Sequence, residues 1–275
     1  MPAFAGTFYW GQVMPRVLAK GDNLNELNGN YVQQPLLEPV FLNSVPKSGT
    51  HLMRNIVRMF VAVDQQYHEA FIQYPILQQH RAAFSTATPC LSWGHLLFSD
   101  DSAMALRNVR HVVLVRDPYD WVLARARFFL SDTFEGSIDH LKGGNVLVEE
   151  ALNMMIFGIH NKAPSIQDIY LNNAIAWLGT KIKLVRFEEL IHNLKNLESD
   201  VAESYFDQLL RDCAIPNLPE DWRERVLVGS DRKQSGTARE NLAGSMVDLP
   251  DELPEMQKKL VDVAIPGYRR LLGYE

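Results

Sequence analysis

The stretch Phe41-Leu-Asn-Ser-Val-Pro-Lys-Ser-Gly-Thr-His51 decides the fold class of this 275-residue chain. Its first half is apolar enough for a buried central strand, and Pro46 and Gly49 then break regular structure. From position 51 to position 63 apolar residues recur at helical spacing, which predicts a helix. A strand, a tight loop and a helix in this order direct backbone N–H groups and a helix N-terminus at one point, where an anion is favoured.

The loop differs from the phosphate loop of ATP-dependent enzymes. That loop follows the pattern G-x-x-x-x-G-K-[S/T], whereas here the order is Lys-Ser-Gly-Thr after a proline, with no upstream glycine. An ordinary nucleotide triphosphatase is therefore disfavoured. Lys47 adds a full positive charge, and Ser48 and Thr50 add hydroxyl donors. The alternative is that a Pro/Gly turn before a helix contains a lysine by chance, and the later segments of the chain must decide between the two.

Composition and charge limit the class of protein. The chain has 27 Lys and Arg against 33 Asp and Glu, and its net charge of −6 argues against a general nucleic-acid binder. Its 47% of hydrophobic residues is ordinary for a globular protein, and no apolar run approaches membrane-spanning length. Cys90 and Cys213 are far apart and in no metal-ligand spacing, which argues against a disulfide scaffold or a zinc site. We expect a soluble, cytoplasmic protein without a secretory signal that binds neither nucleic acid nor a membrane.

Two further predicted strands end in residues that can carry chemistry. Residues 90–94 are predicted to form a short strand that delivers His95 at its end. The run His111-Val-Val-Leu-Val-Arg116 is the clearest strand of the sequence and ends in Arg116. A residue at the carboxyl end of a strand in an open α/β sheet points into the ligand crevice, which distinguishes His95 from the other histidines.

Several of these segments resemble one family, the sulfotransferases that use 3′-phosphoadenosine 5′-phosphosulfate (PAPS). Pro-Lys-Ser-Gly-Thr after an apolar strand resembles their 5′-phosphosulfate loop. A strand ending in Arg116, then Asp117-Pro-Tyr-Asp120 and a helix predicted for residues 121–130, is similar to their 3′-phosphate-binding segment. His95 lies 21 positions before Arg116, close to the family's spacing between its catalytic histidine and that arginine.

Two later segments extend the resemblance. Phe187-Glu-Glu-Leu190, after a strand predicted for residues 181–187, resembles the family's Tyr-Glu-Asp-Leu element, whose ring borders the adenine. Ser230-Asp-Arg-Lys-Gln-Ser-Gly236 resembles the Arg-Lys-Gly-x-x-Gly loop that closes over the 3′-phosphate, with Gln234 where the family usually has glycine.

The fold that the resemblance implies is one α/β domain over residues 1–275, with a mostly parallel central sheet flanked by helices, related to the P-loop nucleotide kinases. Residues 1–38 are rich in Gly, Asn and polar residues, which predicts an irregular N-terminal arm. Residues 131–165 are expected to form an insertion that helps to cover the acceptor. Residues 64–87 are predicted to be helical or irregular.

The reaction that the resemblance implies is transfer of a sulfuryl group from PAPS to a hydroxyl or amine of a small-molecule acceptor, which leaves 3′-phosphoadenosine 5′-phosphate (PAP). His95 would be the general base and Lys47 would stabilise the leaving phosphate, so no metal is required. The implied cofactor-binding residues are Lys47, Ser48, Gly49, Thr50, His51, Leu52, Arg116, Arg127, Phe187, Arg232, Lys233 and Gln234. Of these, the loop residues would hold the 5′-phosphate, and the basic residues the 3′-phosphate.

One position departs from the family pattern. The family's 3′-phosphate-binding serine falls at Ala124, and alanine cannot donate a hydrogen bond. Arg127 lies at i+3 on the same predicted helix face and is expected to replace it, whereas Arg125 is rotated by about 100°. The alternative is that both arginines are solvated residues of the helix surface.

Two other functions stay open. A non-catalytic homologue would bind PAP or another nucleotide without turnover, and the departures at Ala124 and Gln234 are compatible with it. An ATP-dependent P-loop kinase would need a Walker A glycine pattern and a magnesium carboxylate, and the first is absent from the sequence.

Overall fold

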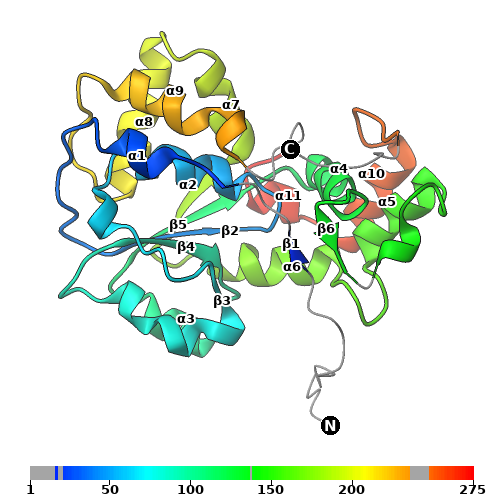
Figure 1. Cartoon of the computed structure of the whole chain (residues 1–275). Coiled ribbons are helices and arrows are strands. Elements are labelled where there is room, and N and C mark those ends of the chain that lie inside the picture. The colour runs from blue at the N-terminus through cyan, green and yellow to red at the C-terminus, as the bar shows by residue number, and fades with distance from the viewer. Residues whose placement is uncertain (1–15, 18–20, 137, 236–247) are drawn as a thin grey trace.

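A computed structural model of the chain describes residues 16–17, 21–136, 138–235 and 248–275. Five strands form its central sheet in the order β3-β4-β2-β5-β7, and every neighbouring pair is parallel (Figure 1). In chain order the strands are β2 (Val40–Ser44), β3 (Ile72–Gln73), β4 (Leu91–His95), β5 (Arg110–Val115) and β7 (Lys183–Arg186). The predicted single α/β domain with a parallel central sheet is confirmed.

Helices cover both faces of the sheet (Figure 1). One face is covered by α1 (Leu24–Asn28), α2 (Thr50–Arg58), α7 (Phe187–Lys195), α8 (Asp200–Asp212) and α9 (Trp222–Ser230). The other face carries a 3-10 helix (Tyr74–Phe84), α3 (Asp100–Ala105) and α6 (Ile166–Asn173). Short 3-10 turns lie at Val63–Gln65, Asp139–Leu141, Ile175–Trp177 and Arg232–Gln234.

A second group of helices packs together beside the sheet. It consists of α4 (Pro118–Phe129), α5 (Val148–Phe157), α10 (Glu255–Ala264) and α11 (Tyr268–Leu271). Nearby, β1 (Arg16–Val17) pairs antiparallel with β6 (Phe134–Glu135). The residues of segment 131–165 that the structure describes therefore contain β6 and α5, and their apolar side chains pack against Phe128 of α4.

The sequence of β2 explains why it lies at the centre of the sheet. All five of its residues are buried, as expected for a parallel strand that is covered on both faces. Val40 and Leu42 point to the α2 layer, whereas Phe41 points to the opposite layer and meets Phe84 edge to face, with ring centroids 5.5 Å apart.

Several parts of the chain differ from the sequence prediction, and the helix predicted for residues 51–63 ends at Arg58. Segment 1–38 is not wholly irregular, because β1 and α1 lie within it. Segment 64–87 contains the strand β3, whose two residues are too few to show a strand period. Phe187 begins α7 and does not end a strand, because Glu188 and Glu189 favour a helix N-terminus through their interaction with its dipole.

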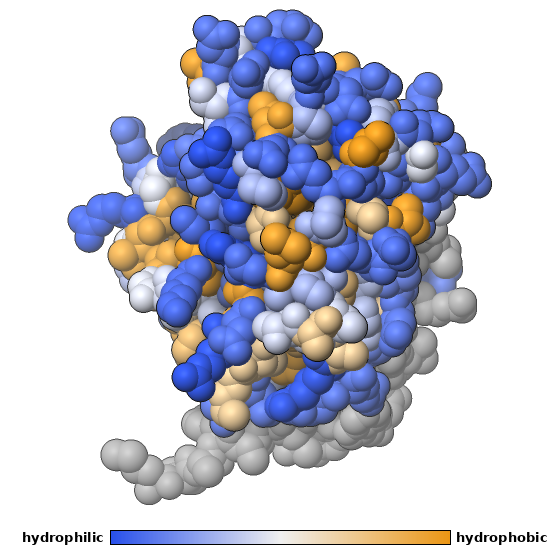
Figure 2. Space-filling view, turned by 90° about the vertical axis from the view of Figure 1, so that its left-hand side faces the viewer, coloured by the Kyte–Doolittle hydropathy of each residue, from blue (hydrophilic) through white to orange (hydrophobic). Residues whose placement is uncertain are grey.

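None of the helices in the described ranges is long and apolar enough to cross a bilayer. The face shown in Figure 2 is mostly hydrophilic, and its hydrophobic residues form small groups with polar residues between them. Scattered exposed hydrophobic residues of this kind are normal for a globular domain.

Candidate functional site

Most of the predicted site residues surround one cavity of about 630 Å³ at the carboxyl ends of the parallel strands. The predicted residues that line it are Lys47, Gly49, Thr50, His51, Leu52, His95, Arg116, Arg127, Phe187 and Arg232. Ala124, the position of the missing serine, lines it as well. The convergence follows from topology, because the residues after β2, β4, β5 and β7 meet at one edge of a parallel sheet.

The loop between β2 and α2 is held in a tight conformation. Lys47 has φ +68° and Gly49 has φ +97°, both in the left-handed region. A Cβ atom on Gly49 would lie 2.5 Å from the Phe187 ring, so glycine is required both by the backbone and by the packed ring. The indole Nε1 of Trp121 donates to the Pro46 carbonyl at 2.5 Å and anchors the loop to α4.

The side chain of Lys47 packs against an aromatic ring in the wall of the cavity. Its Nζ lies 2.9 Å from the centroid of the Phe128 ring, a cation–π contact. Burial lowers the pKa of Lys47 to about 7, because the ammonium group has lost much of its hydration. An anion in the cavity would restore the preference of Lys47 for its charged form.

His95 is held through one nitrogen of its ring. Its Nδ1 lies 3.0 Å from the carbonyl oxygen of Ser44, which can only accept, so Nδ1 carries the proton. The ring of Phe71 packs edge-on at 4.7 Å. Burial, together with the charges of Lys47 and His51, lowers the pKa of His95 to about 3, although the Ser44 carbonyl opposes this shift. His95 is therefore a neutral imidazole whose Nε2 is available to accept a proton.

The buried amide of Asn43 fixes the end of the strand that carries His95. Its Oδ1 accepts from the backbone N–H of Leu96 at 2.9 Å, and its Nδ2 donates to the Leu96 carbonyl at 3.0 Å. The same Nδ2 lies 3.2 Å from Nε2 of His111, and burial lowers the pKa of His111 to about 3. A neutral His111 accepts from Asn43, so Asn43 holds the backbone on the carboxyl side of His95 in place.

Two predicted site residues each have a buried donor without a partner in the described part of the chain. Nε of Arg116 and Oγ of Ser48 are buried and make no hydrogen bond there. The guanidinium carbon of Arg116 lies 4.6 Å from the centroid of the Phe187 ring. Buried polar groups are usually satisfied, so these two donors fit a site that binds an anionic ligand.

The segment after Arg116 is tied to the C-terminus. The Asp117 carboxylate accepts from the backbone N–H of Tyr119 at 3.0 Å and pairs with Arg269 at 2.9 Å. The Asp117 backbone N–H donates to Glu188 at 2.9 Å, and Glu188 accepts from the hydroxyl of Tyr274 at 2.7 Å. The last residues of the chain thus lock the ends of β5 and β7 together behind the cavity.

Arg125 and Arg127 lie on different sides of α4. Arg125 is buried and donates to the carbonyls of Met155 at 2.8 Å and Pro164 at 2.7 Å, so it is not a solvated residue. Arg127 lines the cavity, and its Nη2 donates to the Pro250 carbonyl at 3.0 Å.

Ser48, Lys233 and Gln234 are predicted site residues that do not line the cavity. Gln234 faces α1 and α2, since its Oε1 accepts from the Asn23 backbone at 3.2 Å and its carbonyl accepts from Asn55 at 3.3 Å. Asp231 explains the arrangement, because its side chain accepts from the Lys233 N–H at 2.9 Å and closes a 3-10 turn. That turn leaves Arg232 at the cavity and the Lys233 side chain exposed. Gly236, the last residue of the predicted loop, lies outside the described residues.

Sequence reasoning missed several residues of the wall. These are Asn55, Phe128, Ile191, Leu194, Lys195 and Gly229, whereas the lining residues Ser230, Asp231 and Ser235 lie in the predicted loop but were not singled out. One group had a detectable signal: Ile191, Leu194 and Lys195 follow Phe187 at i+4, i+7 and i+8, which is one face of a helix. Assigning Phe187 to a strand end concealed that face.

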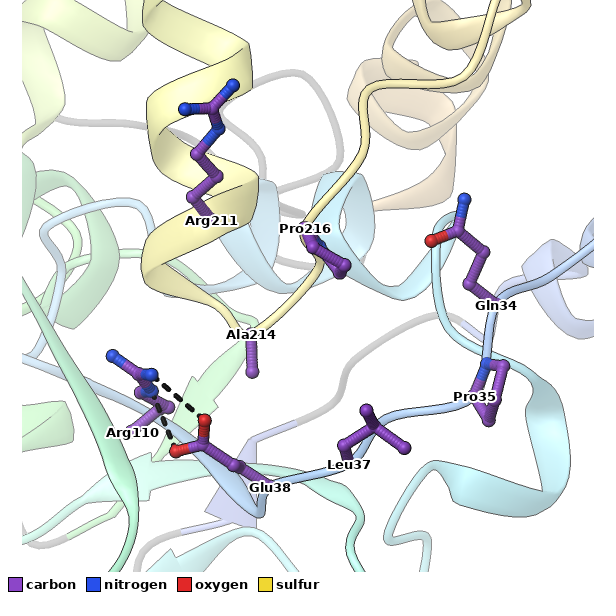
Figure 3. A pocket seen from close by; sticks show the side chains of 8 residues that line it. All are labelled: Gln34, Pro35, Leu37, Glu38, Arg110, Arg211, Ala214 and Pro216. Carbon is purple, nitrogen blue, oxygen red and sulfur yellow. Dashed lines mark hydrogen bonds and ion pairs between the residues drawn. The ribbon is translucent and has the colours of Figure 1, made fainter.

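A second hollow of about 530 Å³ lies at the amino ends of β2 and β5 (Figure 3). Its charged residues are already paired: Arg110 donates two hydrogen bonds to Glu38, each at 2.9 Å, and Arg211 pairs with Asp207 at 2.8 Å. This hollow therefore offers little to a charged ligand. In the described ranges no three His, Cys, Asp or Glu side chains are placed to hold a metal ion.

Comparison with known proteins gives matches among solved structures. Mouse sulfotransferase SULT7A1 complexed with PAP has a TM-score of 0.54 and 13% identity, over 93% of this chain and 94% of that chain. Retinol dehydratase in complex with androsterone and inactive cofactor PAP has a TM-score of 0.49 and 13% identity, over 84% of this chain and 80% of that chain. No protein-family model and no curated protein matches the sequence. The first likeness shows the fold, so the chain has the fold of the sulfotransferases, in agreement with its motifs.

Proposed function

We propose that this chain, which has the sulfotransferase fold, transfers a sulfuryl group from PAPS to a hydroxyl or amine of a small-molecule acceptor. The observation that carries the proposal is the convergence of Lys47, His95 and Arg116 on one cavity from the ends of three parallel strands. A lysine, a neutral histidine and an arginine together provide charge neutralisation, a proton acceptor and an anion anchor.

The loop residues suit the 5′ end of the nucleotide. The N-terminus of α2 begins at Thr50, and the N–H groups of Ser48, Gly49 and Thr50 would hold the 5′-phosphate together with the unpartnered hydroxyl of Ser48. Lys47 adds the positive charge that the leaving phosphate needs. His51 and Leu52 extend the same wall.

A second group of lining residues suits the 3′ end of the nucleotide. Arg116, Arg127 and Arg232 would hold the 3′-phosphate, since all three line the cavity and a guanidinium group matches phosphate oxygens. Phe187 lies beside Arg116 and offers a flat face to the adenine. Lys233 and Gln234 have no part in this site in the observed arrangement.

Proton transfer is assigned to His95. When bound, PAPS supplies the sulfuryl group, and the acceptor must lose a proton as it attacks. The Nε2 of His95 is unprotonated because Nδ1 carries the proton toward Ser44, so Nε2 accepts the acceptor's proton. Asn43 and Phe71 keep the ring in this orientation.

PAP is expected to stabilise the protein much more than ADP or AMP does, because only PAP carries the 3′-phosphate that three arginines can bind. The shift in melting temperature with each nucleotide measures this. A ligand at a hundred times its Kd adds about 2.7 kcal/mol to the free energy of unfolding. Equal shifts for PAP and ADP would show that the protein does not recognise the 3′-phosphate. The absence of any shift with PAP would contradict the proposed function.

Arg127→Ala is expected to weaken PAP binding by about one to two orders of magnitude, because a charge-assisted contact to phosphate contributes roughly 1.5 to 3 kcal/mol. Calorimetric titration of PAP measures it. Arg125→Ala is the matched control on the same helix. It should lower thermal stability, because it leaves the Met155 and Pro164 carbonyls without their donor, yet change PAP affinity little. Unchanged PAP affinity in Arg127→Ala would show that Arg127 does not replace the hydrogen-bond donor that is missing at Ala124.

A further inference from the structure

Ser44, the last residue of β2, joins the two halves of the proposed site. Its side chain is fully buried, and its Oγ lies 2.6 Å from Oγ1 of Thr50 and 3.0 Å from Nδ1 of His95. Thr50 begins α2 in the anion-binding loop, whereas His95 ends β4. The hydroxyl of Ser44 is therefore the link between the loop and the histidine.

One arrangement of donors directs this hydrogen-bond chain from His95 toward the cavity. Nδ1 of His95 carries a proton because the Ser44 carbonyl oxygen, also 3.0 Å away, can only accept. When the Nδ1 proton is shared between the Ser44 carbonyl and hydroxyl oxygens, the Ser44 hydroxyl can donate its own hydrogen to Thr50, which makes one continuous chain. The hydroxyl hydrogen of Thr50 is then left to point into the cavity that Thr50 lines, toward any anion bound there.

We propose, on the premise of the proposed function, that Ser44 is a positioning residue that couples nucleotide binding to the base, so that an anion accepting from Thr50 makes Nε2 of His95 a stronger base. The physical reason is cooperativity, since each hydrogen bond in a chain polarises the next in a low-dielectric interior. An anion at the end of the chain strengthens the bond from Thr50, then that from Ser44, then that from Nδ1, which favours the imidazolium form.

The charges around His95 make such an activation necessary. Lys47 from the loop and His51 from α2 face His95, and any positive charge on either disfavours its protonation. The apolar ring of Phe71 contributes no compensating charge. Without a neighbouring anion His95 is consequently a weak base. Its basicity rises when the nucleotide brings negative charge, so the base becomes effective only once the sulfuryl donor is in place.

The experiment is an NMR titration of ¹⁵N-histidine-labelled protein with saturating PAP. In the parent, PAP should raise the pKa of His95 by roughly one to three units. In Ser44→Ala with saturating PAP the pKa should be lower than in the parent complex by about one unit. Turnover at saturating PAPS should fall about three- to tenfold. The rise in the His95 pKa on PAP binding should also be smaller in Ser44→Ala than in the parent, whereas loss of the local hydrogen bond alone would lower the pKa equally in the free protein and in the complex.

Three variants make the test specific. Ser44→Thr keeps a hydroxyl and should restore the pKa of the parent complex. Thr50→Val interrupts the hydrogen-bond chain at the end away from His95. It should lower the pKa of His95 at saturating PAP, although Thr50 does not contact that ring. Ser92→Ala is the matched control, because Ser92 is an equally buried serine of the sheet whose hydroxyl donates to the Val40 carbonyl at 3.2 Å, and it should change nothing.

The outcomes separate the two proposals. If PAP does not bind the parent, the proposed function fails. If PAP binds and the pKa of His95 in the complex is the same in the parent and in Ser44→Ala, the coupling through Ser44 is wrong while the nucleotide site stands.

Discussion

His95→Ala is expected to lower turnover by about 10²- to 10⁴-fold, the usual loss when a positioned general base is removed. PAP affinity should stay nearly unchanged, because Nδ1 is bound by Ser44 and the free Nε2 is the atom that would meet the acceptor. Formation of sulfated product from PAPS and a panel of small alcohols and amines, followed by mass spectrometry, measures turnover, and calorimetric titration measures PAP affinity.

His80→Gln is the matched control for this change. His80 is a half-buried histidine outside the cavity, and its Nδ1 lies 2.8 Å from the hydroxyl of Tyr67. Its replacement should leave both turnover and PAP affinity as in the parent. Full sulfuryl transfer by His95→Ala would mean that His95 is only a residue at the end of a strand and that another group removes the proton.

The parts of the fold that the sequence predicted are those with strong local signals. β2 begins with three apolar residues and β5 ends with four, the two strands pair with each other, and such runs suit strands buried on both faces. His95 and Arg116 could be placed at one crevice because parallel strands end at the same edge of a sheet. Neither prediction required knowledge of tertiary contacts.

The parts that sequence reasoning missed depend on contacts between distant segments. β3 has two residues, and only its pairing with β4 makes it a strand. The contact of Lys47 with the ring of Phe128 joins the loop after β2 to α4, and three strands of the chain lie between the two. In the sequence Ser44 is an ordinary strand residue, because its contacts with Thr50 and His95 form only in the folded structure.

Lys47→Met is expected to lower turnover by about 10²- to 10³-fold, as when one donor that stabilises developing negative charge is removed. Unlike the histidine change, it should also weaken PAP binding, because Lys47 lies in the loop that holds the 5′-phosphate. Lys183→Met is the control at a surface lysine, whose partner is Asp212 at 3.3 Å, and it should leave both quantities unchanged. Product formation and calorimetric titration measure the two effects.

The burial of Lys47 also predicts how PAP affinity depends on pH. Burial lowers the pKa of Lys47 in the free protein to about 7, so above that pH most molecules hold it neutral. Bound PAP favours the charged form and raises this pKa, so binding takes up a proton between the two pKa values. PAP affinity should therefore fall as pH rises above about 7, by up to roughly tenfold per pH unit, and Lys47 should add no pH dependence below it.

Titrations of PAP between about pH 6 and pH 9, in buffers of different ionisation enthalpy, test this dependence by measuring both the affinity and the number of protons taken up. Lys47→Met should lose the dependence above about pH 7, because methionine has no proton to gain. Phe128→Leu removes the ring beside Nζ while keeping an apolar wall, and should leave proton uptake in place while shifting the pH at which it begins. If the parent binds PAP with no proton uptake above about pH 7, Lys47 is already charged in the free protein, and its burial against Phe128 does not control the site.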